Sequence, residues 1–418
     1  MVKKYLKSDF FRNVATLSVG TAFAQAIPLL ISPILTRLFT PDDFGELTLF
    51  TSLTALVCVV ASLRYEIAIL LPDKDDDALL LTRLSAKIAV WVTLALAIAL
   101  PFWYMGSEYA GSGSFHSLYW LAPLSVLLLA ANQIQVNWLS RKKNYKNMAS
   151  SRFAQAAGSG AFTLLFGAFG FGAWGLAIAT VIGQLSTVLY SYRAAGNAIY
   201  SKVLSTPFKV FKPIALRFQN FPRYNAPHAF IDSVTNNGIN FFIDFLLGSV
   251  ITGFYGFSFR MLKAPSALVS GAVYQVFYQR AVELNNKQQS IRPQLTRLYI
   301  QLFLLAFVPF GLLFFIGPDV FAFVFGEKWR AAGTISAIIA PWLLFNFVSS
   351  PAACLTSVKE KQAQALFLVL IDVALKFLAF YIGYRYINHP QGAFITFSAV
   401  ATAMQLYWMS WFYRLAGK

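Results

Sequence analysis

Charged side chains are scarce in this sequence of 418 residues, at 12% of all positions. A water-soluble domain carries about a quarter charged residues, so most of the surface of this chain cannot face water. Cysteine and histidine are rarer still, with two and three copies. The sequence therefore predicts no disulfide framework, no Cys/His metal site and no cofactor.

Signatures of catalysis and of nucleic-acid binding are also missing. Residues 170–175 fit the spacing G-x-G-x-x-G, but no strand precedes them and they join two apolar stretches, so dinucleotide binding is not predicted. The net charge of +17 does not indicate a nucleic-acid partner, because the basic residues are dispersed over short connections instead of forming one contiguous surface.

Apolar residues, by contrast, make up 57% of the sequence, and Phe alone occurs 41 times. They form about twelve stretches of roughly 20 residues or more, the length that crosses the hydrocarbon core of a bilayer. The predicted spans are residues 10–36, 44–71, 80–104, 117–139, 150–170, 172–192, 226–247, 250–281, 298–325, 332–357, 363–386 and 391–413. The predicted fold class is an all-α integral membrane protein with about twelve transmembrane helices in two six-helix bundles.

Lys and Arg concentrate in alternate connections between these spans. The other connections contain only Arg37, Lys328, Arg330 and Arg385. Because basic loops remain in the cytoplasm, this asymmetry predicts a multi-pass protein of the bacterial inner membrane with both termini in the cytoplasm.

The longest connection divides the chain. We expect an N-terminal six-helix bundle at residues 1–195, a basic cytoplasmic linker at 196–225 and a C-terminal six-helix bundle at 226–418. Two halves with the same orientation would be related by a pseudo-two-fold axis along the membrane normal, as in transporters built from parallel repeats.

Several ionisable side chains lie inside predicted spans, where lipid cannot solvate them. Arg64 and Glu66 lie in the second span, about 10 Å from its cytoplasmic end. Arg260 and Lys263 share one face of the eighth span, which contains no acidic partner close to them. Each basic residue either faces a water-filled functional cavity or forms an internal ion pair, for example with Glu66.

The seventh span carries a polar stripe. Its members, which recur at helical spacing, are Ser233, Asn237, Asn240 and Asp244. Amide and hydroxyl groups on one face suit sugar hydroxyls, and hydrogen bonding between helices explains the stripe equally well. Gln25 in the first span is a similar polar group. Asp372 and Lys376 are four residues apart, which predicts a structural ion pair on one helix.

Particular blocks of this sequence resemble a known family. They are LTRLFTPDDFG at residues 35–45, ASLRYE at 61–66, GFY at 253–255 and VFGEKW at 324–329. In these blocks the chain resembles the Wzx-type oligosaccharide flippases of the multidrug/oligosaccharidyl-lipid/polysaccharide exporter superfamily. The first block is the most specific, and the similarity extends along the whole chain.

The resemblance implies two six-helix bundles around a central, often cationic cavity. Such a protein would move undecaprenyl-pyrophosphate-linked oligosaccharide repeat units from the cytoplasmic to the periplasmic leaflet by alternating access, for O-antigen or another surface polysaccharide. The resulting candidates for substrate binding are Gln25, Arg64, Asn237, Asn240, Arg260 and Lys263, and those for ion coupling are Glu66, Asp232 and Asp244. The expected partners are the lipid-linked glycan, membrane lipids, a polysaccharide polymerase and a chain-length regulator.

Two other functions compete with this hypothesis. A multidrug or cation exporter of the same superfamily should have an acidic cavity, whereas Arg64, Arg260 and Lys263 favour an anionic substrate. A membrane polysaccharide polymerase or ligase would be an enzyme, and such enzymes usually carry a long outer loop. The predicted outer connections are short, so a transporter is the preferred hypothesis.

Overall fold

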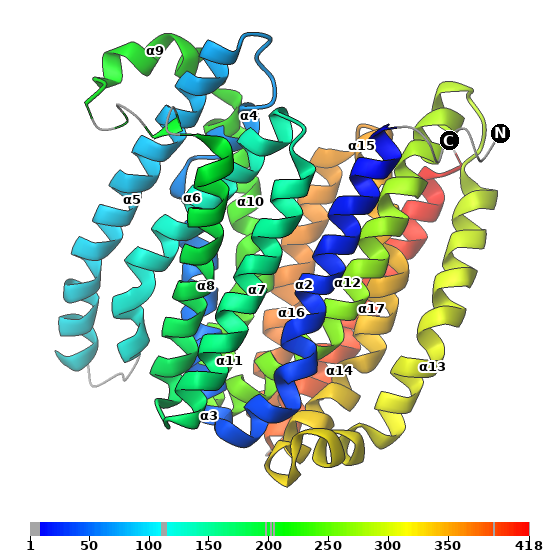
Figure 1. The fold of residues 1–418 in the computed structure, drawn as a ribbon. Coiled ribbons are helices and arrows are strands. Elements are labelled where there is room, and N and C mark those ends of the chain that lie inside the picture. The colour runs from blue at the N-terminus through cyan, green and yellow to red at the C-terminus, as the bar shows by residue number, and fades with distance from the viewer. Residues whose placement is uncertain are drawn as a thin grey trace. The chain divides into compact units, whose positions relative to one another are not determined.

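The structure, a computed structural model, describes residues 9–109, 115–196, 199–200, 203, 205–387 and 389–417, with side chains from residue 20 onward. Within these ranges every regular element is helical, as predicted (Figure 1). The α-helices and π-helical turns of the first part of the chain are α2 (Asp9–Leu38), α3 (Pro41–Ala61), α4 (Tyr65–Ala68), α5 (Asp75–Tyr109), α6 (Ala122–Arg141), α7 (Tyr145–Ala168), α8 (Gly172–Ala195), α9 (Phe208–Arg217), η3 (Phe221–Asn225), α10 (Ala226–Ser233), η4 (Val234–Gly238) and α11 (Ile239–Leu247). The α-helices that follow are α12 (Ser249–Asn286), α13 (Arg292–Phe325), α14 (Arg330–Ser349), α15 (Leu355–Val358), α16 (Gln362–Tyr386) and α17 (Pro390–Leu415), and short 3-10 turns are η1 (Ser117–Leu121), η5 (Glu327–Trp329) and η6 (Ser350–Cys354).

Each predicted span coincides with a long helix or with a run of consecutive helices. Eight helices in the described ranges are by themselves long and apolar enough to cross a membrane. Three further helices, α7, α12 and α17, have 24, 38 and 26 residues. These lengths also exceed the roughly 20 residues that a crossing requires. The seventh span is the continuous run α10, η4 and α11.

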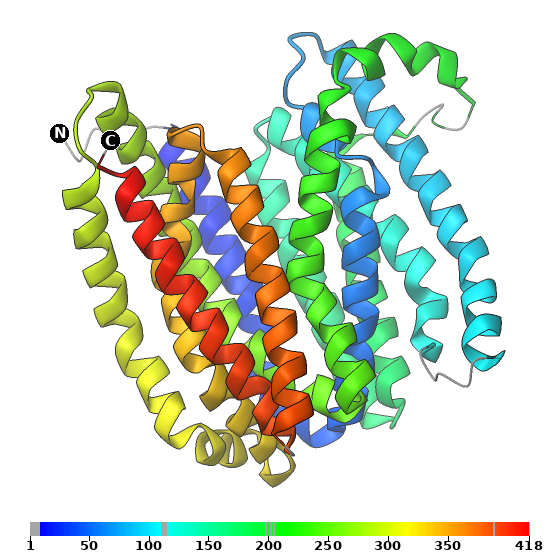
Figure 2. The same cartoon turned by 180° about the vertical axis from the view of Figure 1, so that it is seen from behind.

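The chain folds as two compact units, residues 1–253 and 254–418. In the first unit, α7 packs along α2 and α8, while α3 lies against α6, α8 and α10. In the second unit, α14 packs against α13 and α17, and α16 lies beside α17 (Figure 2). The first unit thus includes residues 226–253, which we grouped with the C-terminal half from the sequence.

The start of α3 shows how local sequence shapes the first unit. Thr40 and Asp43 form a capping box, in which each side chain binds the backbone N–H of the other, and Pro41 occupies the first helical position. A Cβ added to Gly45 would lie 1.9 Å from the carbonyl oxygen of Ser249. Only glycine therefore lets α3 touch the first turn of α12 at this crossing.

The connection between α7 and α8 is the tight turn that the sequence predicts. Gly170 and Gly172 adopt φ angles of +73° and +54°, the left-handed region that glycine enters without strain. The two helices consequently pack closely against each other.

The predicted cytoplasmic linker contains a docked helix, α9, which lies across the end of α5 (Figure 1). Phe211 and Ile214 on one face of α9 are buried in an apolar cluster with residues of α4 and α5. Lys87 of α5 donates a hydrogen bond of 2.5 Å to the carbonyl of Thr206, and its ammonium lies 4.6 Å from the centre of the Phe208 ring. The linker is therefore part of the first unit.

The prediction of one continuous helix over residues 44–71, with Arg64 and Glu66 inside it, is wrong. Helix α3 ends at Ala61, and the backbone leaves the helix through Leu63 and Arg64, which have φ angles of +50° and +64°. Side chains other than glycine avoid this left-handed region, so surrounding contacts must hold the turn in place. Arg64 and Glu66 lie in this turn and in α4, beyond the end of α3.

Candidate functional site

A polar cavity of about 330 Å³ lies inside the first unit. Its walls come from the turn before α4, from α4 itself, from α6 and from α7. The lining residues are Arg64, Glu66, Ile67, Asn132, Gln133, Val136, Asn137, Arg152 and Gln155. Two of these residues are basic, one is acidic and four carry amides, a composition that the membrane-facing surface of the protein could not accommodate.

The wall formed by α4 contains an ion pair. Nη1 of Arg64 lies 3.5 Å from Oε1 of Glu66. The Glu66 side chain is buried, with 2% of its surface exposed, and its other oxygen accepts a short hydrogen bond from the hydroxyl of Ser62. Arg64 is a quarter exposed, and its Nε is buried without a hydrogen-bond acceptor among the described residues. Arg64 thus retains donors that can bind a ligand.

The opposite wall, formed by α6 and α7, contributes a second guanidinium and the amides. Nη1 of Arg152 donates a short hydrogen bond to the hydroxyl of Thr21 on α2. The amide nitrogen of Asn137 donates to the carbonyl of Gln133 at 2.9 Å, while Oδ1 of Asn132 is buried without a donor among the described residues. This wall therefore presents both a cation and unfilled hydrogen-bonding capacity.

The arrangement suits an anionic ligand with hydroxyl groups. A guanidinium binds phosphate oxygens through paired N–H donors, and amides both donate to and accept from sugar hydroxyls. Two guanidiniums against one carboxylate leave the cavity with a net positive charge. Within the described residues, no group of three or more His, Cys, Asp or Glu side chains could hold a metal ion.

The polar stripe of the seventh span forms contacts within the first unit. Asn240 donates to the hydroxyl of Ser52 on α3 at 2.8 Å. Asn237 bonds back to Ser233, one turn earlier, within the stretch that η4 converts to a π-helix. Asp232 accepts a contact of 3.5 Å from the amide of Asn236. Hydrogen bonding between helices, the alternative explanation of the stripe, is thus observed at Asn240.

Asp244, the last member of the stripe, pairs with His116. Their Oδ2 and Nε2 atoms are 3.1 Å apart, between α11 and the start of η1. Burial lowers the pKa of His116, but the hydrogen bond and charge of Asp244, together with the charges of Glu46 and Asp42, outweigh this effect and raise the pKa overall. The ring of His116 also contacts Tyr119 edge to face. His116 is therefore a proton-sensitive contact of the seventh span.

Arg260 and Lys263 belong to α12 in the second unit. The Arg260 side chain is exposed. Lys263 donates a hydrogen bond of 2.7 Å to Oδ1 of Asn346 on α14. Asp372 and Lys376 form the predicted ion pair within α16, with 2.8 Å between Oδ2 and Nζ.

Of the charged cavity residues, Arg152 was not predicted from the sequence, and the lining amides were not among the candidate site residues either. It lies two residues into the predicted span at 150–170, beside a basic connection, where a surface position was the simpler explanation. Helix α7 begins earlier, at Tyr145, so Arg152 lies two turns inside it. The spacing of Arg152 and Gln155, three residues apart on one helical face, was the available signal. Gln25 does not line this cavity, and its Oε1 is buried with no donor among the described residues.

The fold matches solved structures of known transporters along nearly the whole chain. The lipid II flippase MurJ, in an inward closed conformation, superposes with a TM-score of 0.71 over 94% of this chain and 86% of that one, at 14% identity. A multidrug resistance MATE family transporter of the MOP superfamily, in an inward-facing conformation, gives a TM-score of 0.67 over 94% and 93%, at 12% identity. A MOP superfamily transporter from Pyrococcus furiosus, described as having a binding pocket of reverse polarity, gives 0.53 over 97% and 96%, at 14% identity.

These matches define the class: the chain is an all-α, multi-pass membrane protein with the fold shared by MATE transporters and MurJ, which confirms the predicted fold class. Residues 34–334 match the family described as polysaccharide biosynthesis protein. The chain belongs to this family, as its resemblance to polysaccharide-exporting flippases implied. No curated protein sequence matches it.

Proposed function

We propose that this protein flips polyprenyl-pyrophosphate-linked oligosaccharides across the bacterial inner membrane, for O-antigen or another surface polysaccharide. The cavity of the first unit is the observation that supports this most strongly. It combines Arg64 and Arg152, which suit a pyrophosphate, with amides that suit sugar hydroxyls. Membership of the polysaccharide biosynthesis family and a fold shared with a lipid II flippase support the same class of substrate.

The working orientation follows from the distribution of Lys and Arg. Both termini, α4 and α9 would lie on the cytoplasmic side, so that the cavity accepts the glycan headgroup from the leaflet in which it is assembled. Two helical bundles would then alternate in access to the two sides of the membrane, as the resemblance to Wzx-type proteins implies. Arg260 and Lys263 remain candidates for substrate contacts on the second unit, and a polymerase with its chain-length regulator would receive the product.

The rival function is export of organic cations, which the multidrug MATE relatives in the same structural class favour. A cavity for cations needs an excess of carboxylates. Here one carboxylate, Glu66, is opposed by two guanidiniums, and it is already paired with Arg64. The charge of the cavity therefore favours an anionic substrate.

The proposal is tested in a strain that lacks the chain and is complemented with variants. Arg64→Gln and Arg152→Gln should each lower surface polysaccharide about ten-fold, and the double variant should abolish it, because each guanidinium supplies charge-assisted hydrogen bonds to phosphate. Arg297→Gln, which neutralises an exposed arginine on α13 outside the cavity, is the matched control.

Membrane protein levels must be equal among these variants. Full export by the double variant would contradict the proposal. Binding assays on purified protein separate the rivals, because undecaprenyl-pyrophosphate glycan should bind and tetraphenylphosphonium should not. The reverse preference would identify a cation exporter.

A further inference from the structure

Glu66 is held in a position where its carboxylate can compete with a bound anion for Arg64. One carboxylate oxygen accepts the hydrogen bond from Ser62, and the other faces Nη1 of Arg64 at 3.5 Å. With 2% of its surface exposed, Glu66 has almost no water to stabilise its charge. The charged pair and the serine hydroxyl therefore replace the hydration that burial removes.

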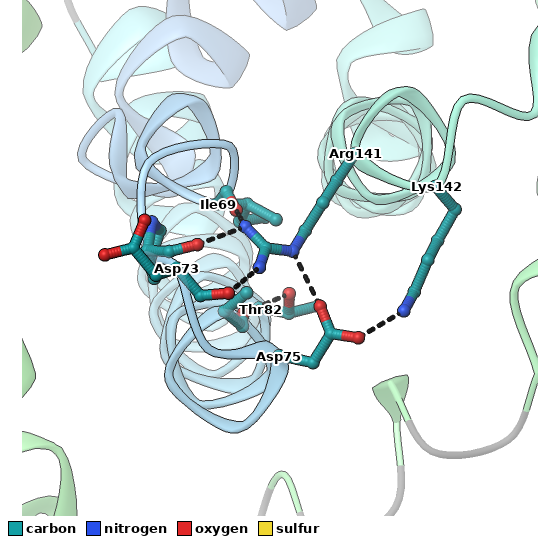
Figure 3. Close-up of polar contacts among 8 residues, drawn as sticks. Ile69, Asp73, Asp75, Thr82, Arg141 and Lys142 are labelled. Atoms are coloured by element: carbon teal, nitrogen blue, oxygen red, sulfur yellow. Dashed lines mark hydrogen bonds and ion pairs between the residues drawn. The ribbon is translucent and has the colours of Figure 1, made fainter.

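The ion pair with Glu66 engages few of the hydrogen-bond donors of Arg64. At 3.5 Å the contact with Glu66 is a long ion pair, and the Nε of Arg64 is buried without an acceptor among the described residues. By contrast, the guanidinium of Arg141 in the same unit donates hydrogen bonds to three backbone carbonyls and to the carboxylate of Asp75 (Figure 3). The contrast indicates that Arg64 is kept charged in the cavity while its directional donors stay free for a ligand.

We infer that Glu66 is the resident counter-anion of Arg64, which a substrate phosphate displaces on binding and which recaptures Arg64 on release. This inference rests on the proposed function, and it names Glu66 as the residue that sets the affinity of the cavity for the substrate phosphate. Ser62 holds Glu66 in place while Arg64 turns toward the phosphate. When the phosphate leaves, the pair re-forms, so Arg64 has an anionic partner in the empty cavity as well as in the loaded one.

The competition has a measurable consequence. Glu66→Gln keeps the size of the side chain and can still accept the Ser62 hydrogen bond, but it no longer offers Arg64 a negative charge. Undecaprenyl pyrophosphate should then bind about ten-fold more tightly, because no internal anion must be displaced. Maximal export should fall together with the half-saturating substrate concentration, because tighter binding of the loaded state slows release.

A double-mutant cycle separates competition from a general effect of charge. If Glu66 acts through Arg64, Glu66→Gln should tighten binding in the wild-type background and leave affinity unchanged in the Arg64→Gln background. If Glu66 merely lowers the positive potential of the cavity, Glu66→Gln should tighten binding equally in both backgrounds, and the inference is overturned. If Glu66 only positions Arg64, Glu66→Gln should weaken binding, which also overturns it.

The experiment uses the full chain in lipid nanodiscs, with undecaprenyl pyrophosphate as the probe and uncharged undecaprenol as the control. If the wild-type protein does not bind undecaprenyl pyrophosphate more tightly than undecaprenol, the proposed function itself is contradicted. A wild type that prefers the pyrophosphate, with no coupling between the two positions, would contradict only the role of Glu66. Glu66→Asp, which withdraws the carboxylate by one methylene, provides a second variant that should tighten binding by a smaller factor.

Discussion

Replacing Arg141 with Ala should loosen the turn that leads from α4 into α5. Arg141 lies at the last position of α6, and its guanidinium reaches across to this turn (Figure 3). The nitrogen Nη1 donates to the carbonyls of Ile69 and Pro72 at 3.2 and 2.6 Å, Nη2 donates to that of Asp73 at 3.3 Å, and Nε donates to the carboxylate of Asp75 at 3.0 Å.

The size of the effect follows from which of these acceptors can reach water. Ile69 and Pro72 are buried, and a buried carbonyl that loses its donor costs about 1–3 kcal/mol. Asp73 is exposed and Asp75 is 58% exposed, so water replaces those two contacts at little cost. Local opening of the turn should thus become easier by about 3 kcal/mol, equivalent to roughly 100-fold faster exchange of its backbone amides.

Hydrogen exchange of peptides covering residues 67–76 measures this opening in purified protein. Arg141→Lys should recover about half of the lost free energy, because one ammonium reaches fewer carbonyls than the planar guanidinium. Lys142→Ala is the control, because Lys142 is 45% exposed and its ammonium contacts the Asp75 carboxylate and the Trp138 ring rather than the carbonyls of the turn. Exchange in Arg141→Ala that stays within two-fold of wild type would refute this account of the turn.

Three further predictions concern packing, protonation and driving force. Gly45→Ala should cost about 3 kcal/mol or more and reduce folded protein in the membrane, because its Cβ would meet a backbone carbonyl, whereas Gly106→Ala, with nothing within 4 Å, should accumulate normally. Because the pKa of His116 is raised above its ordinary 6.5, its pairing with Asp244 should stabilise the fold fully below that pH and less as pH rises through the raised value. The thermal unfolding midpoint should therefore fall between neutral and alkaline pH in wild type and change less in His116→Asn; equal profiles would contradict this. Finally, a pyrophosphate with about two charges gains roughly 4–5 kcal/mol per 100 mV when it moves outward across an inside-negative membrane. Potentials set with valinomycin should therefore accelerate flipping in proteoliposomes that have no sodium or pH gradient. Flux that does not depend on voltage would exclude the membrane potential as the driving force.

Sequence reasoning was most successful where the answer depends on solvent or on a single helix. Hydropathy reports which stretches can lie in lipid, and the predicted spans coincide with long helices in the described ranges. The ion pair of Asp372 and Lys376 was predictable because helical geometry alone brings residues four apart onto one face. The turn at Gly170 and Gly172 was predictable because glycine tolerates the required backbone angles.

The cavity could be predicted only in part. Arg64 and Glu66 stood out because charged groups are costly in a membrane span, and both line the cavity. Arg152 looked like a loop residue, because its burial depends on α2 and α6 packing against α7, and no local pattern encodes that packing. The predicted linker likewise contains a docked helix, because the apolar face of α9 finds partners on α4 and α5 that lie more than 120 positions earlier in the chain.

By itself, then, the sequence determined the membrane class, the positions of the spans and the presence of ionisable groups that lipid would reject. Tertiary structure alone decided where α3 stops. Residues 59–66 contain no glycine or proline, so local propensity favours a continuous helix through Arg64. The chain nevertheless leaves the helix at Leu63 and Arg64, because Arg141 of α6 binds the carbonyls that follow α4. These contacts, which join residues 72 and 69 positions apart, outweigh the local preference, and Arg64 and Glu66 lie in a cavity wall.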